Sequence, residues 1–415
     1  MIYLRMIIVL FTLFTWCLVE PAHLNYMLSA IRAHFSNTRH HDPQYMSYKN
    51  RAKEYIYNEF VRFGLETEYH TFDEPRLSST VQFHTVVGVL KGTKFGTKDD
   101  SILGVGAHYD TVNTTKGVDD NGGGVAAMLE VIRQITNMNK KGTKRGNTII
   151  FASFDLEENQ LSGSRHFVES WLPLYLGIHY GSAAPTTGQG VIVFDTPMEY
   201  KTTDNSQLVP DAPREAFKQA FPVAYKSVES DNFQGDFLNL IYRQPTADSK
   251  LANTFKTSWQ TAGRSQYELE LFPLQFSNVS NLTQMEFSFY NNFLRSDHYN
   301  FWTKMFPAIQ LTDSANFRGN MMQCYHKPCD NLETLLTNDN INFLGKTADV
   351  TVMTIHKLSE PTSDYDTTTD YDTTTEGLSA GGIAGIVIGI LLPLILISVL
   401  VLCMRRNRNK FASMS

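Results

Sequence analysis

Residues 148–158 read TIIFASFDLEE, an apolar run that stops at three acidic side chains. An uninterrupted apolar run of this length is typical of a strand buried on both faces, as in the parallel sheets of α/β proteins. Two further β-like runs precede it at 85–90 and 102–107, and a helical pattern over 122–135 lies between. This alternation predicts a mixed, mostly parallel central sheet flanked by helices.

The pattern extends in both directions along the chain. Upstream, apolar residues at three- and four-residue spacing over 49–63 predict an amphipathic helix that ends at Gly64. Downstream, four more elements are expected: a helix opening at 163–167, strands at 190–195 and 307–313, and a final helix over 338–357. The stretch 201–292 is less periodic, and we expect it to form peripheral helices and loops that shape a substrate cleft.

Polar side chains that can bind a metal ion follow nearly every predicted strand. They are His108 and Asp110 in GAHYDT, Asp119 and Asp120 in GVDDNGGG, Glu157 and Glu158 in FDLEEN, Asp195 in VIVFDT, and His326 and Asp330 in CYHKPCDN. Because the carboxyl ends of strands in an open α/β sheet meet at one crevice, we expect these side chains to converge. Two imidazoles with several carboxylates suit zinc, so the sequence predicts a hydrolytic metal centre.

Each motif taken alone also has an ordinary structural explanation. A short triplet such as the one that begins at His108 is frequent by chance, and Asp119 or Asp120, directly before a helix, could cap it. Asp195 could likewise be a helix cap, and His326 could be a surface histidine. Only the complete set, in this order on strand ends, is specific.

Taken together, these motifs resemble those of the M28 family of zinc aminopeptidases, exopeptidases that use two zinc ions. The matching stretches are HYDT, DDNGGG, FDLEE followed by GSRHF, SDHYNFW, PAIQLTD and YHKPCDNLETL, spread over 51–358. The resemblance implies five zinc ligands: His108 and Asp195 on one ion, Glu158 and His326 on the other, and Asp120 bridging both.

Two further residues complete the expected catalytic site. The resemblance implies that Glu157 is the general base. Asp110 stands two residues after His108, where its carboxylate can hold the second nitrogen of that imidazole while the first faces the metal. Asp297 and His298 in SDH also match the family pattern, and for both we expect a structural role.

The resemblance implies hydrolysis of peptide bonds, most simply at the free N-terminus of a peptide or protein. Three alternatives stay open: glutaminyl cyclase activity, which uses one zinc ion on a related fold, carboxypeptidase activity, and a catalytically silent receptor ectodomain. The net charge is −6, and basic residues cluster only in the RRNRNK tail. Nucleic acid is therefore not an expected partner.

The two ends of the sequence predict a membrane-anchored ectodomain. Arg5 precedes an apolar run, the order of a secretory signal peptide, with a retained anchor as the alternative. A later uncharged apolar run is long enough to cross a bilayer, and the basic residues after it predict a type I topology. The expected organisation is a signal peptide at 1–19, a peptidase ectodomain at 20–358, an acidic Thr-rich stalk at 359–379, a transmembrane helix at 380–404 and a cytoplasmic tail at 405–415.

Other features fit an ectodomain that is extracellular or in the lumen of the endosomal or secretory system. Sequons occur at Asn113, Asn278 and Asn281. Cys324 and Cys329 can close a short loop around His326 in an oxidising compartment, and two free thiols are the alternative. Within the predicted span, every fourth position is glycine at Gly381, Gly385 and Gly389. This spacing would let two copies pack as a homodimer, although it also occurs in solitary spans.

Overall fold

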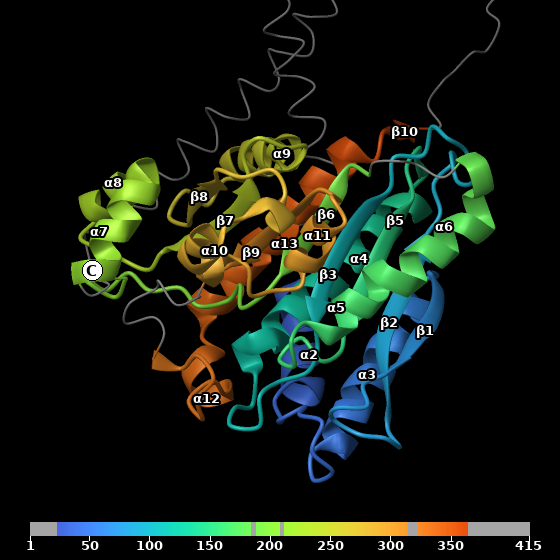
Figure 1. The fold of residues 1–415 in the computed structure, drawn as a ribbon, viewed down its shortest axis with the longest axis horizontal. Coiled ribbons are helices and arrows are strands. Elements are labelled where there is room, and N and C mark those ends of the chain that lie inside the picture. The colour runs from blue at the N-terminus through green and yellow to red at the C-terminus, as the bar shows by residue number, and fades with distance from the viewer. Residues whose placement is uncertain (1–22, 184–187, 208–210, 314–322, 364–415) are drawn as a thin grey trace, which may run out of the picture. The chain divides into compact units, whose positions relative to one another are not determined.

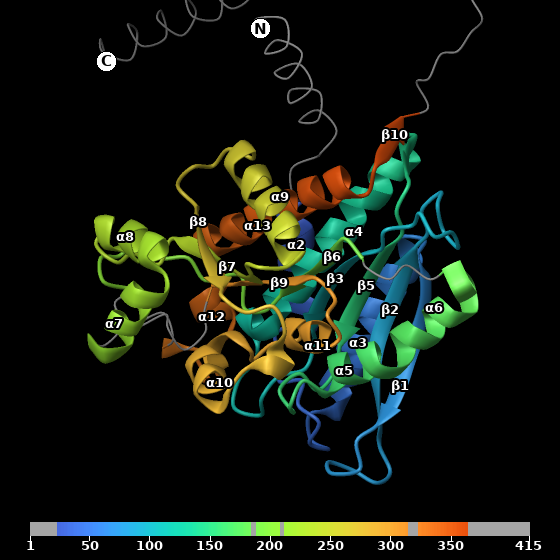
Figure 2. The same ribbon diagram turned by 45° about the horizontal axis from the view of Figure 1, so that its top comes forward.

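The computed structural model of this chain describes residues 23–183, 188–207, 211–313 and 323–363. Eight strands in these ranges form one sheet in the order β1-β2-β5-β3-β6-β9-β7-β8 (Figures 1 and 2). They are β1 (Glu66–Asp73), β2 (Gln82–Leu90), β3 (Leu103–His108), β5 (Ile149–Phe154), β6 (Gly190–Phe194), β7 (Phe237–Arg243), β8 (Glu268–Leu274) and β9 (Ala308–Thr312). Four of the seven neighbouring pairs are parallel, including all pairs from β5 to β9. The predicted mixed sheet is confirmed.

Helices cover both faces of this sheet (Figures 1 and 2). One layer contains α2 (Leu24–His34), α3 (Met46–Arg62), α4 (Gly124–Lys140), α9 (Asp248–Thr261), α12 (Leu332–Leu335) and α13 (Asn338–Leu358). The other contains α5 (Ser162–His166), which continues through Phe167–Trp171 into α6 (Leu172–Tyr180), with α7 (Asp211–Ala220), α8 (Pro222–Ser230), α10 (Gln284–Tyr290) and α11 (His298–Thr303). A separate antiparallel pair joins β4 (Thr143–Arg145) to β10 (Pro361–Ser363).

The apolar run at 148–154 is explained by this three-layer arrangement. Along β5, Ile149 and Phe151 pack in the core with α4 and α13, whereas Ile150, Ala152 and Phe154 pack in the core with α6 and α11. Successive side chains of a strand point to opposite faces, so a strand covered on both faces is mostly apolar along its whole length, and the one polar side chain of β5, Ser153, donates its hydroxyl to the Ala107 carbonyl.

The elements predicted outside 201–292 are confirmed with small shifts at their ends. The helix expected over 49–63 is α3, and the chain leaves it at Gly64, whose φ of 85° lies in the left-handed region that glycine enters without strain. The final helix, expected over 338–357, is α13. The helix expected from 122 begins at Gly124 and runs further, to Lys140.

The interpretation of 201–292 as peripheral helices and loops is wrong in part. This stretch contains β7 and β8, two strands of the central sheet, and α9, which packs against the core beside α13. Every residue of β7 is buried, so its sequence FLNLIYR has no alternation of polar and apolar positions to reveal a strand. A short apolar run cannot be distinguished from a buried helix by periodicity alone.

The predicted signal peptide at 1–19, the span at 380–404 and the tail at 405–415 lie outside the described residues. No helix within the described ranges has the length and apolar character of a bilayer span. At the boundary expected for the stalk, Pro361–Ser363 pairs with β4.

A buried ion pair joins three elements on the β7 side of the sheet. Arg243 at the end of β7 donates from Nε and Nη2 to the two carboxylate oxygens of Asp248 in α9, at 2.8 and 3.0 Å. Oδ1 of Asp248 also accepts the backbone N–H of Ala308, the first residue of β9, at 3.1 Å. Both side chains are at most 1% exposed. The pair therefore fixes the start of α9 against two strands.

We expect Asp248→Ala to lower the free energy of unfolding by about 3–5 kcal/mol, because it leaves a buried guanidinium without its carboxylate. Urea unfolding of the purified protein measures this loss. The matched control is Glu169→Ala, which breaks an ion pair with Lys304 whose side chains are 46% and 40% exposed. That change should cost less than about 1 kcal/mol. Equal losses in the two variants would contradict the prediction.

Candidate metal centre

The predicted ligands lie at the carboxyl ends of the parallel strands. His108 is the last residue of β3, and Asp195 directly follows β6. Glu157 and Glu158 come shortly after the end of β5, while Asp120 stands in the turn between β3 and α4. Because β3, β5 and β6 are adjacent and parallel, their ends meet at one edge of the sheet.

The first ligand group is centred on the imidazole of His108. Its Nε2 atom lies 3.4 Å from Oδ1 of Asp120 and 3.6 Å from Oδ1 of Asp195. The second group is centred on His326, whose Nε2 lies 3.1 Å from Oδ2 of Asp120 and 3.3 Å from Oε2 of Glu158. Within each group, one ligand atom per residue lies within 4.8 Å of the others.

The carboxylate of Asp120 belongs to both groups and offers one oxygen to each. The structure thus brings all five predicted ligands together, in the two sets that the sequence resemblance implies. Their binding of zinc stays a prediction.

The residues present fit two zinc ions in their chemistry. Nε2 of His108, Oδ2 of Asp120 and Oε1 of Glu158 are buried and have no hydrogen-bond partner within the described residues. Burial and the charge of Asp120 raise the pKa of Glu158 to about 8. Burial, followed by the charges of Asp195 and Glu158, raises the pKa of Glu157 well above its usual range. Buried acids this close to each other call for compensating positive charge, which divalent cations would provide.

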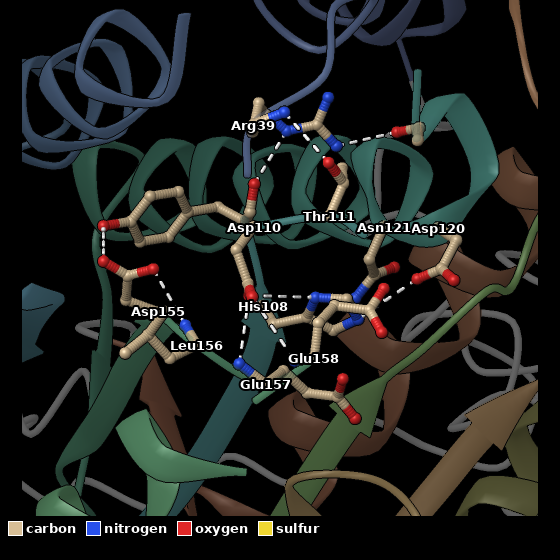
Figure 3. Close-up of polar contacts among 12 residues, drawn as sticks. Arg39, His108, Asp110, Thr111, Asp120, Asn121, Asp155, Leu156, Glu157 and Glu158 are labelled. Atoms are coloured by element: carbon tan, nitrogen blue, oxygen red, sulfur yellow. Dashed lines mark hydrogen bonds and ion pairs between the residues drawn. The ribbon is translucent and has the colours of Figure 1, made fainter. Parts of the chain in front are cut away.

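Asp110 positions both the imidazole and the two glutamates, as Figure 3 shows. Its Oδ1 lies 3.4 Å from Nδ1 of His108, on the opposite side of the ring from the ligand nitrogen. The same carboxylate accepts the backbone N–H groups of Glu157 and Glu158 at 3.1 and 3.3 Å. The predicted contact with His108 is present, and the bonds to the backbone are an addition that spacing along the sequence could not reveal.

Asp330 supports the turn that carries the shared ligand. It is 1% exposed, and its two oxygens accept the backbone N–H groups of Asp119 and Asp120 at 2.8 and 3.2 Å. Thr115 donates its hydroxyl to the same carboxylate at 3.2 Å. The sequence identified Asp330 as metal-binding in type, but the structure gives it hydrogen bonds to this turn instead of a place in either ligand group.

Arg39 is a buried cation that the sequence analysis missed. Its guanidinium donates to the carbonyl oxygens of Tyr109 and Gly117, each at 2.7 Å, and to three further carbonyls (Figure 3). Burial lowers its pKa to about 10, although the charge of Asp330 opposes that shift. Gly117 has a φ of 65°, and a Cβ there would collide with Thr111 and with the backbone of Asp120. Arg39 and Gly117 therefore fix the path between His108 and Asp120.

Lys49 and Asp155 form a second missed support, behind the glutamates. Lys49 in α3 places Nζ 2.6 Å from Oδ1 of Asp155, and both side chains are 2% exposed. Tyr109 donates its hydroxyl to Oδ2 at 2.9 Å, and the N–H of Leu156 donates to Oδ1 at 2.8 Å. These bonds hold the turn that begins at Leu156, whose φ of 54° is uncommon for a residue with a side chain. No metal-ligand spacing in the sequence marks Lys49.

His326 is held in a loop closed by the disulfide between Cys324 and Cys329, so the predicted pairing is confirmed. Its φ of 57° lies in the left-handed region, and Thr114 donates its hydroxyl to the His326 carbonyl at 2.9 Å. Burial acts to lower the pKa of the imidazole, but the adjacent carboxylate of Asp120 raises it to about 9. The disulfide-closed loop thus restrains the position of His326, which lies outside regular secondary structure.

A polar cavity of about 310 Å³ opens beside the first ligand group. Its lining comprises Asp195, Thr196, Asn292, Arg295, Gln310, Thr312 and Tyr325. Gln310 donates Nε2 to Oδ2 of Asp195 at 3.2 Å, and Tyr325 stacks on His326 with ring centroids 3.9 Å apart. The sequence analysis did not predict Arg295 or Tyr325. A larger cavity, of about 570 Å³, is lined only by apolar residues and glycines, so it carries no groups for hydrolysis.

The structural role expected for His298 agrees with its contacts. Its ring shares a hydrogen bond of 2.9 Å with the carbonyl of Phe293 and packs edge-on against Trp302. Asp297 is fully buried, and neither carboxylate oxygen has a hydrogen-bond partner within the described residues. Its charge contributes to the raised pKa of Glu157, so Asp297 is electrostatically linked to the predicted base.

We expect Asp330→Asn to weaken zinc binding by about 10- to 100-fold, because an amide cannot accept hydrogen bonds from both N–H groups that hold the Asp120 turn. Competition with a chelator of known zinc affinity measures the change. Asp339→Asn, at an exposed position in the first turn of α13, is the matched control and should bind zinc as the wild type does. Wild-type affinity in Asp330→Asn would show that the turn holds its shape without this carboxylate.

Comparison with known proteins agrees with this geometry. Residues 85–176 match the model of peptidase family M28, and this segment includes His108, Asp120, Glu157 and Glu158. The chain is 37% identical over 95 residues to the probable lipoprotein aminopeptidase LpqL of Mycobacterium tuberculosis, covering 23% of this chain and 18% of that protein. It is 33% identical over 91 residues to aminopeptidase Y of Saccharomyces cerevisiae, covering 22% and 16%. The matches thus span less than a fifth of these curated relatives.

Similarity in structure to solved proteins covers more of this chain than similarity in sequence to the curated relatives. LapB from Legionella pneumophila superposes with a TM-score of 0.53 at 15% identity, covering 83% of this chain and 74% of that one. A Zn-dependent exopeptidase from Parabacteroides distasonis gives 0.52 at 13% identity, covering 82% and 99%. Residues 85–176 are thus similar in sequence to peptidase family M28, and the solved structures show that the fold is shared over most of the chain.

Proposed function

We propose that this chain is a zinc aminopeptidase that binds two zinc ions and releases residues from the N-terminus of peptides. The observation that carries the proposal is the Asp120 carboxylate, which offers one oxygen to each of two histidine-centred ligand groups. The aminopeptidase relatives support the choice of reaction. When bound, two zinc ions would polarise the scissile carbonyl and lower the pKa of the attacking water.

The side chains of this chain would then share the remaining work. His108 and Asp195 would hold one ion, and Glu158 and His326 the other, with Asp120 between them. Glu157 would accept a proton from the attacking water and deliver it to the leaving amine nitrogen. Asp110 would keep Glu157 in place through its hydrogen bond to the backbone N–H, and His108 through the contact with Nδ1. The supporting set formed by Arg39, Lys49 and the residues they contact would limit movement of the site.

The polar cavity beside Asp195 is the place we propose for the substrate's N-terminal residue. Its acidic wall at Asp195 would favour a free ammonium group close to the metal centre. Arg295 on the same wall supports a second candidate, carboxypeptidase activity, because a guanidinium can bind a substrate carboxylate. Substrates blocked at one end or the other distinguish these activities.

Glutaminyl cyclase activity is less well supported. The glutaminyl cyclase of Porphyromonas gingivalis shares the fold, with a TM-score of 0.51 at 12% identity. A site that uses one zinc ion would not require the second group of Asp120, Glu158 and His326, which is complete in this chain. A silent receptor ectodomain would likewise not require Glu157 beside two complete ligand groups.

We also propose that the peptidase is a type I membrane protein whose ectodomain faces the extracellular space or the lumen of the secretory or endosomal system. The apolar run at 380–404 with its basic flank, the apolar start at 1–19 and the Cys324–Cys329 disulfide support this topology. The glycines at 381, 385 and 389 would provide the packing face of a homodimer in the bilayer.

We expect Glu157→Gln to retain both zinc ions and to lower kcat by at least about 100-fold, because glutamine cannot carry the transferred proton. Hydrolysis of aminoacyl fluorogenic amides measures the rate, and metal analysis of the same sample measures zinc. Glu54→Gln, at an exposed position in α3, is the control and should keep wild-type activity. A Glu157→Gln variant that turns over at the wild-type rate would refute the proposed mechanism.

We expect zinc removal to abolish activity and readdition to restore it in two equivalents per chain. Titration of the metal-free protein, followed by calorimetry and by hydrolysis of a free and an N-acetylated peptide, measures the count and the end that is cleaved. Full activity after one equivalent would contradict the two-zinc proposal, and cleavage of the acetylated peptide at its C-terminus would favour carboxypeptidase activity.

A further inference from the structure

A second group of acidic side chains lies where α8, β7 and β8 meet, and the proposed hydrolysis makes no use of it. Asp231 caps the C-terminus of α8, Asp236 directly precedes β7, and Glu268 is the first residue of β8. One carboxylate oxygen from each lies within 4.8 Å of the other two. We name these three residues the β7–β8 acidic group.

Two carboxylate oxygens of this group are buried and have no hydrogen-bond partner within the described residues. Asp236 is 8% exposed, and its Oδ1 atom is buried with no hydrogen-bond partner within the described residues. Oδ2 of Asp231 is likewise buried and has no hydrogen-bond partner within the described residues. Among the residues that the structure describes, no lysine, arginine or histidine forms an ion pair with any member of the group. Burying a carboxylate without an opposite charge is costly, so Asp236, with two further carboxylates beside it, needs a cation or a proton.

The surroundings add more negative charge. Glu270 lies two residues after Glu268 on β8, and it is 7% exposed. Burial, with the charges of Glu268 and Asp231, raises the pKa of Asp236 to about 7. Burial and the charges of the group likewise raise the pKa of Glu270 to about 8. A bound cation would relieve this repulsion.

We propose that Asp231, Asp236 and Glu268 bind a calcium ion, at a site additional to the two zinc ions. The donors are all carboxylate oxygens, which hard cations prefer, and the group lacks the nitrogen or sulfur ligands that select zinc. Calcium accepts irregular oxygen cages completed by water, whereas magnesium demands a regular octahedron. The loop from 231 to 236 contributes two ligands from an irregular turn, with positive φ at Asn232 and Phe233, and this suits the larger ion.

The proposed calcium site would stabilise the segment 201–207, which follows the predicted zinc ligand Asp195 in the chain. β7 runs antiparallel to β9, so the start of β7 lies at the same edge of the sheet as the ends of the strands that carry the zinc ligands. Gly235 accepts the backbone N–H of Lys201 at 2.9 Å, and Phe233 accepts that of Gln207 at 2.8 Å. Calcium would thus fix the 231–236 loop and, through these bonds, the segment 201–207.

Binding is tested on the zinc-loaded full chain by equilibrium dialysis with radioactive calcium. The wild type should bind one calcium ion per chain, and Asp236→Asn should lose at least about tenfold in affinity, because the amide removes a charge from the ligand set. Glu215→Gln, at an exposed position in α7, is the matched control and should bind as the wild type does. Absence of saturable binding, or equal binding by Asp236→Asn, would overturn the proposal.

Thermal unfolding gives an independent readout that does not depend on peptidase activity. In buffer cleared of calcium by a chelating resin, Asp236→Asn should unfold at the wild-type temperature or above it, because the substitution relieves repulsion. Calcium at about 100 times the wild-type Kd should raise the wild-type midpoint by about 5 °C and that of the variant by at most about half as much. Equal shifts of the unfolding midpoint in both proteins would mean that calcium binds at another site. No shift in either protein would mean that shared protons balance the charge of the β7–β8 acidic group. Either result would refute the proposal.

Discussion

The Asp120 carboxylate lies between two imidazoles, and the rest of the site is arranged to keep it there. Nε2 of His108 and Nε2 of His326 approach its two oxygens at 3.4 and 3.1 Å. Burial acts to raise the pKa of Asp120, but the close contacts with the imidazoles of His108 and His326 outweigh it and lower the pKa. The residue therefore stays ionised in an environment that would otherwise protonate it, as a bridging ligand must.

The Asp120 carboxylate is held by hydrogen bonds to the backbone of its turn, and not by regular secondary structure. The turn from Val118 to Gly123 is irregular, with non-helical φ and ψ angles at Asp120 and Asn121. Asp330 binds its N–H groups, and Arg39 binds the carbonyls that lead into it. These supports come from segments about 80 and 210 residues away along the chain, so the site closes only when the whole domain has folded. Rigid placement of this kind is what hydrolysis at a metal centre needs.

The two halves of the sheet serve different purposes. The parallel strands β5, β3, β6 and β9 converge on the metal centre, and the apolar layers on both faces hold their ends in register. The strands β7 and β8 run in the opposite direction and carry the β7–β8 acidic group to the same edge. Since β7 pairs with β9, whose Gln310 and Thr312 line the polar cavity, the second half of the sheet contacts a wall of that cavity without contributing a residue to either ligand group.

The sequence by itself determined the parallel centre of the sheet and which side chains meet in the candidate site. Strands such as TIIFASF are mostly apolar because both faces are covered, and acids or histidines at the ends of such strands meet at the crevice. The sequence could not reveal β7, because its fully buried residues show no alternation of polar and apolar positions. It also could not reveal Arg39, which binds remote backbone carbonyls, or Lys49, which pairs with a buried carboxylate. It identified Asp330 but not its function. Tertiary structure alone decided these, because hydrogen bonds and burial between distant segments leave no pattern in the local sequence.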